Sequence, residues 1–243
     1  MFQLISKIPY FSLPFFAEMF LLISGLILLV VGAFVGDKGT KKISWALTAI
    51  LMFVILVLSQ EVPFSPSVLV HPFATSEFLA FIKMLMIFIT ICCLALYISH
   101  LKYDTGLARF EFPVIVLFSL VGMMVMISST DFLTFYMGLE LQSLSIYILT
   151  AFDRKNPKNA EAGLKYFILG TLASIFILYG ISIIYGLSGT INFQDIAIYV
   201  TGASELSKAN FLLMIGLILL ISGLLFKLSA FPFHMWAPDV YEG

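Results

Sequence analysis

Residues 132–149, FLTFYMGLELQSLSIYIL, form an apolar run long enough to cross a lipid bilayer, with one carboxylate near its middle. A membrane-spanning helix needs ~20 predominantly apolar residues. Glu140 lies nine residues after Asp131, which places it ~13 Å along a helix that rises ~1.5 Å per residue. Because a charge at the bilayer centre costs at least ~2.5–3.5 kcal/mol on insertion scales, we expect Glu140 to serve a purpose there.

The rest of the chain repeats this apolar pattern. Hydrophobic residues make up 61% of the sequence and charged residues 11%, whereas soluble domains are about a quarter charged. The apolar runs lie at about 13–35, 43–60, 78–99, 112–129, 131–151, 161–187 and 209–237. The sequence therefore predicts an all-α polytopic membrane protein with about seven transmembrane helices.

The basic residues divide unevenly between the two sides of the predicted membrane. Eight follow the first, third and fifth runs: Lys38, Lys41, Lys42, Lys102, Arg109, Arg154, Lys155 and Lys158. The opposite side holds Lys7, Lys208 and Lys83, the last near the start of the third run. By the positive-inside rule, this asymmetry predicts that the N-terminus lies outside, in the periplasm or intermembrane space.

Glu140 has polar neighbours on its own helix. Tyr136 and Ser143 lie one turn to either side of it, at spacings that share one helix face. Asp131 is a candidate N-cap for the same helix. The stripe indicates a carboxylate that exchanges protons or pairs with a buried cation. A structural pair with no part in transport is the alternative.

Lys227 lies deep in the seventh run, eighteen residues after Ala209 and eleven before Pro238. A lysine at this depth, beside a carboxylate, can load and release a proton as its partner moves. Pro232 lacks a backbone N–H, so we expect the seventh helix to be kinked or broken there. Broken helices near the membrane midplane are common at transporter sites.

Two further residues are candidates for the same path. Lys165 lies about one turn inside the sixth run, so its ammonium can equally reach the basic side of the membrane. His234 follows Lys227 by seven residues, on nearly the same helix face. A histidine can pass a proton onward near neutral pH, or it can hold the kinked end of the helix. Trp236 is typical of an interfacial anchor.

Several classes of soluble-protein chemistry find no support in the sequence. Gly32, Gly36 and Gly39 are not set between a strand and a helix, as a nucleotide-binding fingerprint requires. Cys92 and Cys93 are the only cysteines, and we expect two small buried apolar residues rather than a metal or iron–sulfur site. No catalytic triad is visible either.

Three stretches of the chain resemble a known family. They are GLELQSL at 138–144, EAGLKYFILG at 161–170 and FKLSAFPFHMWAPDVYEG at 226–243. Together they resemble the antiporter-like membrane subunits of respiratory complex I, the NADH–quinone oxidoreductase. The ending APDVYEG is similar to the subunit N family, known in mitochondria as subunit 2.

The resemblance implies a membrane-arm subunit of a redox-driven proton pump. Glu140, Lys165 and Lys227 then match the glutamate of the fifth helix and the lysines of the sixth and the broken seventh. In the family, the glutamate–lysine pair is thought to change partners during the cycle. The resemblance also implies no cofactor in this chain, because NADH, flavin, iron–sulfur clusters and quinone belong to partner subunits. The location implied is a bacterial inner (plasma) membrane or a mitochondrial inner membrane.

The resemblance covers only the first part of the family's fold. Residues 1–110 correspond to three N-terminal helices, and 111–243 to the first part of a proton-translocating repeat that the family follows with an inverted second repeat. A separate polypeptide carries the missing helices if the subunit is split; a truncated product is the other possibility. The remaining expected partners are other membrane-arm subunits and the bilayer, with no nucleic acid.

Two other functions compete with the proton pump. A related cation/proton antiporter or membrane-bound hydrogenase subunit shares the same buried glutamate and lysines. A structural membrane scaffold would use the charges only to lock helices together.

Overall fold

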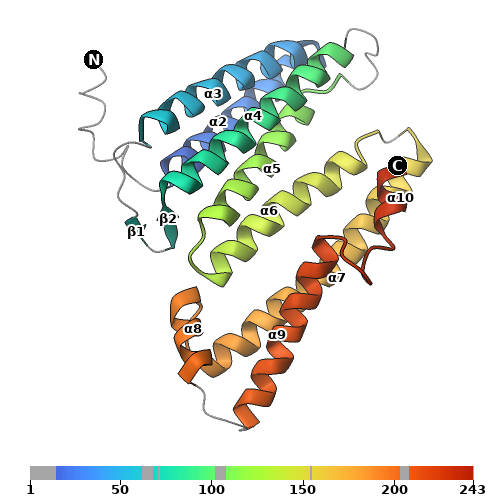
Figure 1. Ribbon diagram of the computed structural model, residues 1–243. Helices are drawn as coiled ribbons and strands as arrows, with labels where there is room; N and C mark the ends of the chain where they lie inside the picture. The colour runs from blue at the N-terminus through green and yellow to red at the C-terminus, as the bar shows by residue number, and fades with distance from the viewer. Residues whose placement is uncertain are drawn as a thin grey trace. The chain divides into compact units, whose positions relative to one another are not determined.

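The computed structural model describes residues 15–61, 68–70, 72–101, 108–153, 155–202 and 208–242, and nearly all of them are helical (Figure 1). The helices are α2 (Phe16–Val35), α3 (Thr40–Glu61), α4 (Glu77–His100), α5 (Glu111–Ser128), α6 (Phe132–Thr150), α7 (Pro157–Ser188), α8 (Phe193–Gly202), α9 (Lys208–Lys227) and α10 (Ala237–Glu242). A 3-10 turn, η1 (Asp37–Gly39), precedes α3, and the strands β1 (Val68–Val70) and β2 (Phe73–Thr75) pair antiparallel.

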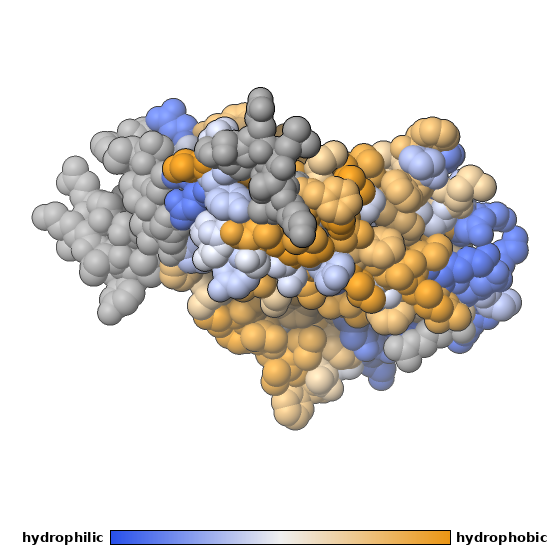
Figure 2. All heavy atoms as spheres, turned by 90° about the horizontal axis from the view of Figure 1, so that it is seen from below, coloured by the Kyte–Doolittle hydropathy of each residue, from blue (hydrophilic) through white to orange (hydrophobic). Residues whose placement is uncertain are grey.

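Most of these helices have the length and composition of membrane spans. Six segments of the described chain are long and apolar enough to cross a bilayer, and they match the first six predicted runs. The apolar part of the seventh, Phe211–Lys227, is shorter. Apolar side chains dominate the surface visible in Figure 2, as expected for helices that face lipid. The chain is a multi-pass α-helical membrane protein.

The first compact unit ends at Ser129 and contains α2 to α5. These four helices run side by side (Figure 1), and α2 packs closely on α5 because Gly25 and Gly32 leave room for Leu117 and Phe110. The prediction of buried cysteines is wrong, because Cys92 and Cys93 are both exposed on α4.

The second compact unit begins at Thr130 and contains α6 to α10. Its closest pair is α7 and α9, which lie side by side in Figure 1. Added side chains at Gly180 and Gly223 would meet backbone carbonyls of the facing helix, those of Gly216 and Ala173. The fourth predicted helix, α5, therefore packs with the first three. The repeat boundary expected near 110 stays a prediction, because packing does not define where a repeat begins.

Local capping explains where α6 and α7 begin. The predicted N-cap of α6 is confirmed: the carboxylate of Asp131 accepts from the backbone N–H of Thr134 at 2.7 Å and from its hydroxyl at 2.9 Å. The helix α7 begins four residues earlier than its apolar run, because Asn156 caps it and Pro157 occupies its first turn. Lys165 consequently lies about two turns inside α7.

The predicted interruption of the seventh helix is present, but it begins before Pro232. The helix α9 ends at Lys227. Ser229 has a positive φ of 56°, the N–H of Ser229 donates to the carbonyl of Phe226, and the N–H of Ala230 donates to that of Leu225. This bond pattern is a Schellman motif, which closes a helix with a left-handed residue. Pro232 cannot continue a regular helix, but α9 has already ended about one turn before it.

Candidate functional site

Glu140 on α6 and Lys227 on α9 face each other, as the sequence predicted. The Nζ atom of Lys227 lies 3.6 Å from Oε1 of Glu140, and the two side chains are 11% and 18% exposed. Both side chains are therefore largely buried, and their charged atoms lie within ion-pair distance. A pair so placed is expensive unless other polar groups complete its hydrogen bonding.

Three hydroxyl groups complete the site. The ammonium of Lys227 donates to Oγ of Ser143 at 2.9 Å and to the phenol oxygen of Tyr147 at 3.0 Å. The hydroxyl of Ser174 on α7 donates to Oε1 of Glu140. Of the predicted stripe, Ser143 joins the site, while Tyr147 rather than Tyr136 supplies the phenol that reaches Lys227.

The backbone of each helix is what allows this convergence. Glu140, Ser143 and Tyr147 follow one another at three and four residues on α6, so their side chains share one face. An added side chain at Gly170 would overlap the phenol oxygen of Tyr147, so the glycine makes room for that ring. Gly223 lets α9 approach α7 one turn before Lys227.

The distances indicate an ion pair that can be exchanged. Lys227 lies closer to the two hydroxyls than to the carboxylate of Glu140. If Glu140 were protonated, the hydroxyls of Ser143 and Tyr147 would still accept from the ammonium. Glu140 and Lys227 each have a hydroxyl partner besides each other, so either can stay hydrogen-bonded if the other loses its charge.

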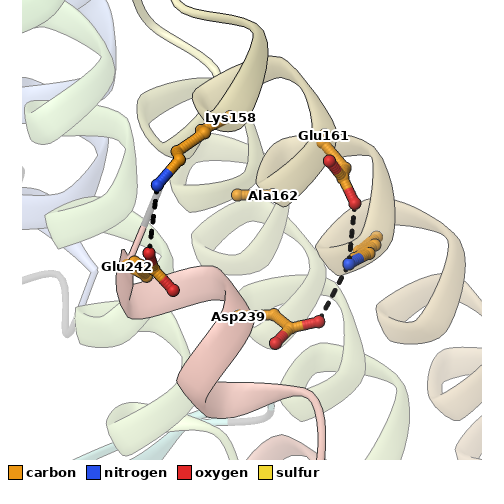
Figure 3. Close-up of a pocket in the computed structure, with 6 residues that line it drawn as sticks. Lys158, Glu161, Ala162, Asp239 and Glu242 are labelled. Carbon is orange, nitrogen blue, oxygen red and sulfur yellow. Dashed lines mark hydrogen bonds and ion pairs between the residues drawn. The ribbon is translucent and has the colours of Figure 1, made fainter.

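Lys165 lies in a second cluster, at the start of α7. Its side chain is 44% exposed, and its Nζ atom lies 2.9 Å from carboxylate oxygens of both Glu161 and Asp239. The ammonium thus pairs with both acids. Lys158 and Glu242 form a neighbouring ion pair at 3.2 Å (Figure 3). Among the described residues, no ion pair or hydrogen bond joins Lys165 to Glu140 or Lys227.

Aromatic rings extend from the first cluster towards the second. The ring of Tyr147 meets that of Tyr166 edge-on at 4.6 Å, and Tyr166 stacks on Trp236 at 4.7 Å. Trp236 also stacks on Phe226, and its indole N–H donates to the Phe226 carbonyl at 3.2 Å. The expectation of an interfacial anchor is wrong for Trp236, because it is buried and packs the segment after α9 back onto α7.

The structure leaves His234 apart from the pair. It lies exposed in the turn segment between α9 and α10, with its ring 5.8 Å from that of Phe231. Within the described part of the chain, it makes no hydrogen bond to Lys227 or Glu140. A role for His234 in proton transfer stays a prediction.

The second half of the chain matches a known family model. Residues 129–243 match the family model described as NADH:quinone oxidoreductase/Mrp antiporter, transmembrane. Subunit N of NADH-quinone oxidoreductase from Paramagnetospirillum magneticum is 42% identical over 231 residues, and that from Rhodospirillum rubrum is 43% identical over 232. The resemblance to complex I subunit N is confirmed. It covers 95% of this chain and 47% of each relative, so the chain spans about half their length.

Solved structures agree with this result. Respiratory complex I from Thermus thermophilus with bound aureothin contains a chain that is 28% identical, with a TM-score of 0.73 over 93% of this chain and 47% of that one. Chains of the archaeal membrane-bound sulfane sulfur reductase and of the Mrp complex from Dietzia share the fold, with TM-scores of 0.80 and 0.74 at 24% and 23% identity. The fold is that of the antiporter-like subunits, over about half of their length.

One pair of charged residues in this subunit N-like chain was missed from the sequence. From the sequence we expect Lys83 among the basic residues of the outer side, but its side chain is 5% exposed and its Nζ atom lies 2.6 Å from Oε1 of Glu18. The hydroxyl of Ser128 donates to the same oxygen at 3.2 Å. The sequence does indicate this pair, because Glu18 lies inside the first run and Lys83 inside the third, near the same predicted side of the membrane.

Proposed function

We propose that this chain forms the first part of a proton-translocating membrane-arm subunit of an NADH–quinone oxidoreductase, with NADH oxidation and quinone reduction in other subunits. The single observation that carries the proposal is the Glu140–Lys227 pair, surrounded by the hydroxyls of Ser143, Tyr147 and Ser174. The confirmed resemblance to subunit N supports it.

The proposed step is a change of partners at Lys227. When a proton reaches Glu140, the carboxylate loses its charge and its attraction for the ammonium falls. Ser143 and Tyr147 then hold the ammonium, which can give its proton to an acceptor further along the path. Return of the negative charge to Glu140 favours reprotonation of Lys227. The reaction at this site is therefore proton transfer alone, with no bond to a soluble substrate.

Lys165 serves as a second station in this proposal. Its ammonium already lies between two carboxylates, Glu161 and Asp239, so it can move towards one as the other is neutralised. The rings of Tyr147, Tyr166 and Trp236 pack in series between the surroundings of Lys165 and Lys227. His234 is proposed as a later station on the same side of the broken helix.

The proposal places the protein in a complex. Its partners are other membrane-arm subunits and whatever chain segment supplies the rest of the relatives' length. NADH, flavin, iron–sulfur clusters and quinone are assigned to partner subunits. The location is an energy-coupling membrane, and the bacterial relatives favour a bacterial inner membrane.

A cation/proton antiporter subunit is the second candidate, because the description of the matching family model names the Mrp antiporter beside NADH:quinone oxidoreductase. The fold does not separate this candidate from the proton pump, because chains of both kinds of complex share it. Dependence of transport on NADH oxidation, in the absence of sodium, does separate them.

The test is to substitute Glu140 and Lys227 in turn and to measure proton uptake by the assembled complex in native membrane vesicles. We expect Glu140→Gln and Lys227→Met to lower NADH-driven proton uptake at least ~10-fold, since each removes a group whose charge must change in the proposed step. The exposed residues Glu77 and Lys42 provide matched controls, as Glu77→Gln and Lys42→Met. Normal uptake in Glu140→Gln would refute the proposal. Loss of assembly with normal uptake in the remainder would favour the scaffold.

A further inference from the structure

The Glu18–Lys83 pair lies at one end of the first unit. Glu18 is the third residue of α2, Lys83 is the seventh of α4 and Ser128 is the last of α5. Successive helices of this unit run in opposite directions, which brings the starts of α2 and α4 to the end of α5. The three residues therefore tie three helices together at a single level.

An apolar layer closes the pair on the side that faces the middle of the helices. One turn deeper on each helix are Leu21, Ile87 and Met124, and none of these side chains is exposed. They lie three or four residues from Glu18, Lys83 and Ser128, so they share the faces of those residues. These apolar side chains offer no hydroxyl group for proton transfer on that side of the pair.

Another set of contacts covers the opposite side. The ring of Phe15, just before α2, lies 5.4 Å from that of Phe73 in β2. Phe73 also forms a β-bridge with Ser129, the residue after α5. The hairpin thus packs over the ends of the helices that carry the pair.

The geometry of this pair differs from that of Glu140 and Lys227. The charged atoms are 2.6 Å apart instead of 3.6 Å, and the side chains are 5% and 4% exposed instead of 11% and 18%. Ser128 donates also to the carbonyl of Met124 at 2.9 Å, so its hydroxyl is held by its own helix. Among the described residues, no hydroxyl accepts from Lys83. If Glu18 lost its charge, the described chain would offer the ammonium no second partner.

We propose that Glu18 and Lys83 form a closed electrostatic clamp that holds α2, α4 and α5 together, and that the pair takes no part in proton transfer. Two glutamate–lysine pairs in one chain thus have opposite roles. The pair in the second unit is surrounded by hydroxyls that permit exchange, and the pair in the first unit is sealed against it. This assignment does not depend on the proposed function.

If the pair is a clamp, removing one charge should lower the amount of complex, and removing both should restore it. A single substitution leaves a buried charge without its partner, whereas two apolar residues of similar size restore a neutral contact. In the assembled complex of native membranes, we expect Glu18→Met or Lys83→Met alone to lower the amount of complex about tenfold or more. The double variant E18M/K83M should return it to within about twofold of the unsubstituted level.

The ratio of protons transported to NADH oxidised separates the clamp from a proton station. We expect this ratio to stay unchanged in E18M/K83M, while Glu140→Gln lowers it without loss of complex. Lys42→Met controls for the loss of an exposed lysine.

Three results would overturn the clamp. One is a normal amount of complex in both single variants. A second is a fully assembled double variant with a reduced proton ratio, which would place the pair on the proton path. If E18M/K83M does not assemble, the exchanged pair E18K/K83E decides: its recovery supports the clamp, and failure of both double variants refutes it. A normal ratio in Glu140→Gln would refute the proposed function and leave the clamp unaffected.

Discussion

The phenol oxygen of Tyr147 occupies the space where a side chain at Gly170 would begin. Because this oxygen accepts from Lys227 at 3.0 Å, the glycine on α7 is what permits the contact between α6 and α9. The packing of three helices and the hydrogen bonding of the buried lysine thus depend on one missing methyl group.

We predict that Gly170→Ala displaces the Tyr147 ring and weakens its bond to Lys227. Inserting a methyl group into a packed interior costs typically ~1–3 kcal/mol, so we expect both a lower thermal stability of the complex and a lower rate of proton uptake. Gly186→Ala is a matched control on the same helix, because nothing lies within 4 Å of the added carbon there. Equal behaviour of the two variants in a melting and uptake assay would show that Tyr147 tolerates displacement.

A second prediction concerns the hydroxyl of Ser143. Ser143→Ala removes an acceptor from the ammonium of Lys227, and hydrogen bonds to charged groups are worth about 1.5–3 kcal/mol. We expect NADH-driven proton uptake to fall about tenfold or more, with NADH oxidation in uncoupled membranes nearly unchanged.

Ser145 provides the control for this experiment. It is buried on the same helix, but its hydroxyl donates to the carbonyl of Leu141 on its own helix instead of reaching Lys227. Ser145→Ala should therefore retain uptake. A loss of equal size in both variants would mean that α6 packing, rather than the lysine's hydrogen bonds, limits transport.

The sequence reveals the parts of this chain that depend on local patterns. Apolar runs locate the membrane helices, Asp131 marks the start of α6, and the depth of Glu140 and Lys227 identifies the central pair. Contacts between distant segments are not visible in this way. The burial of Trp236 depends on stacking against Tyr166, seventy residues away, and no periodicity records it.

Lys83 and Lys165 show the same limit. Lys83 stands near a helix end, where a lysine usually reaches water, and only the carboxylate of Glu18 on another helix explains its burial. Lys165 stands at a similar depth and remains half exposed, because its partners Glu161 and Asp239 lie at the surface. Depth along a helix therefore does not decide burial without knowledge of the facing helix.

Asp239 and Glu242 on α10 permit a test of Lys165. Both pair with lysines of α7, but only Asp239 contacts the proposed station, while Glu242 pairs with Lys158. Exposed ion pairs contribute ~0–1 kcal/mol, so neither Asp239→Asn nor Glu242→Gln should change the stability of the complex appreciably. We expect Asp239→Asn to slow proton uptake severalfold and Glu242→Gln to leave it unchanged. Equal uptake in both variants would mean that Lys165 forms surface ion pairs and takes no part in proton transfer.

The end of α9 provides a last prediction, which concerns Ser229. This residue adopts a positive φ of 56°, and its hydroxyl is buried without a hydrogen-bond partner among the described residues. A left-handed conformation costs an L-residue roughly 1–2 kcal/mol, and glycine adopts it without that cost. Ser229→Gly should therefore raise the melting temperature of the complex, and Ser229→Val should lower it, because a β-branched residue is least compatible with this φ. Since the Schellman motif fixes Lys227 as the last helical residue, Ser229→Val should also reduce proton uptake. If valine and glycine at this position gave equal melting temperatures and equal uptake, the end of α9 would not be held by this motif.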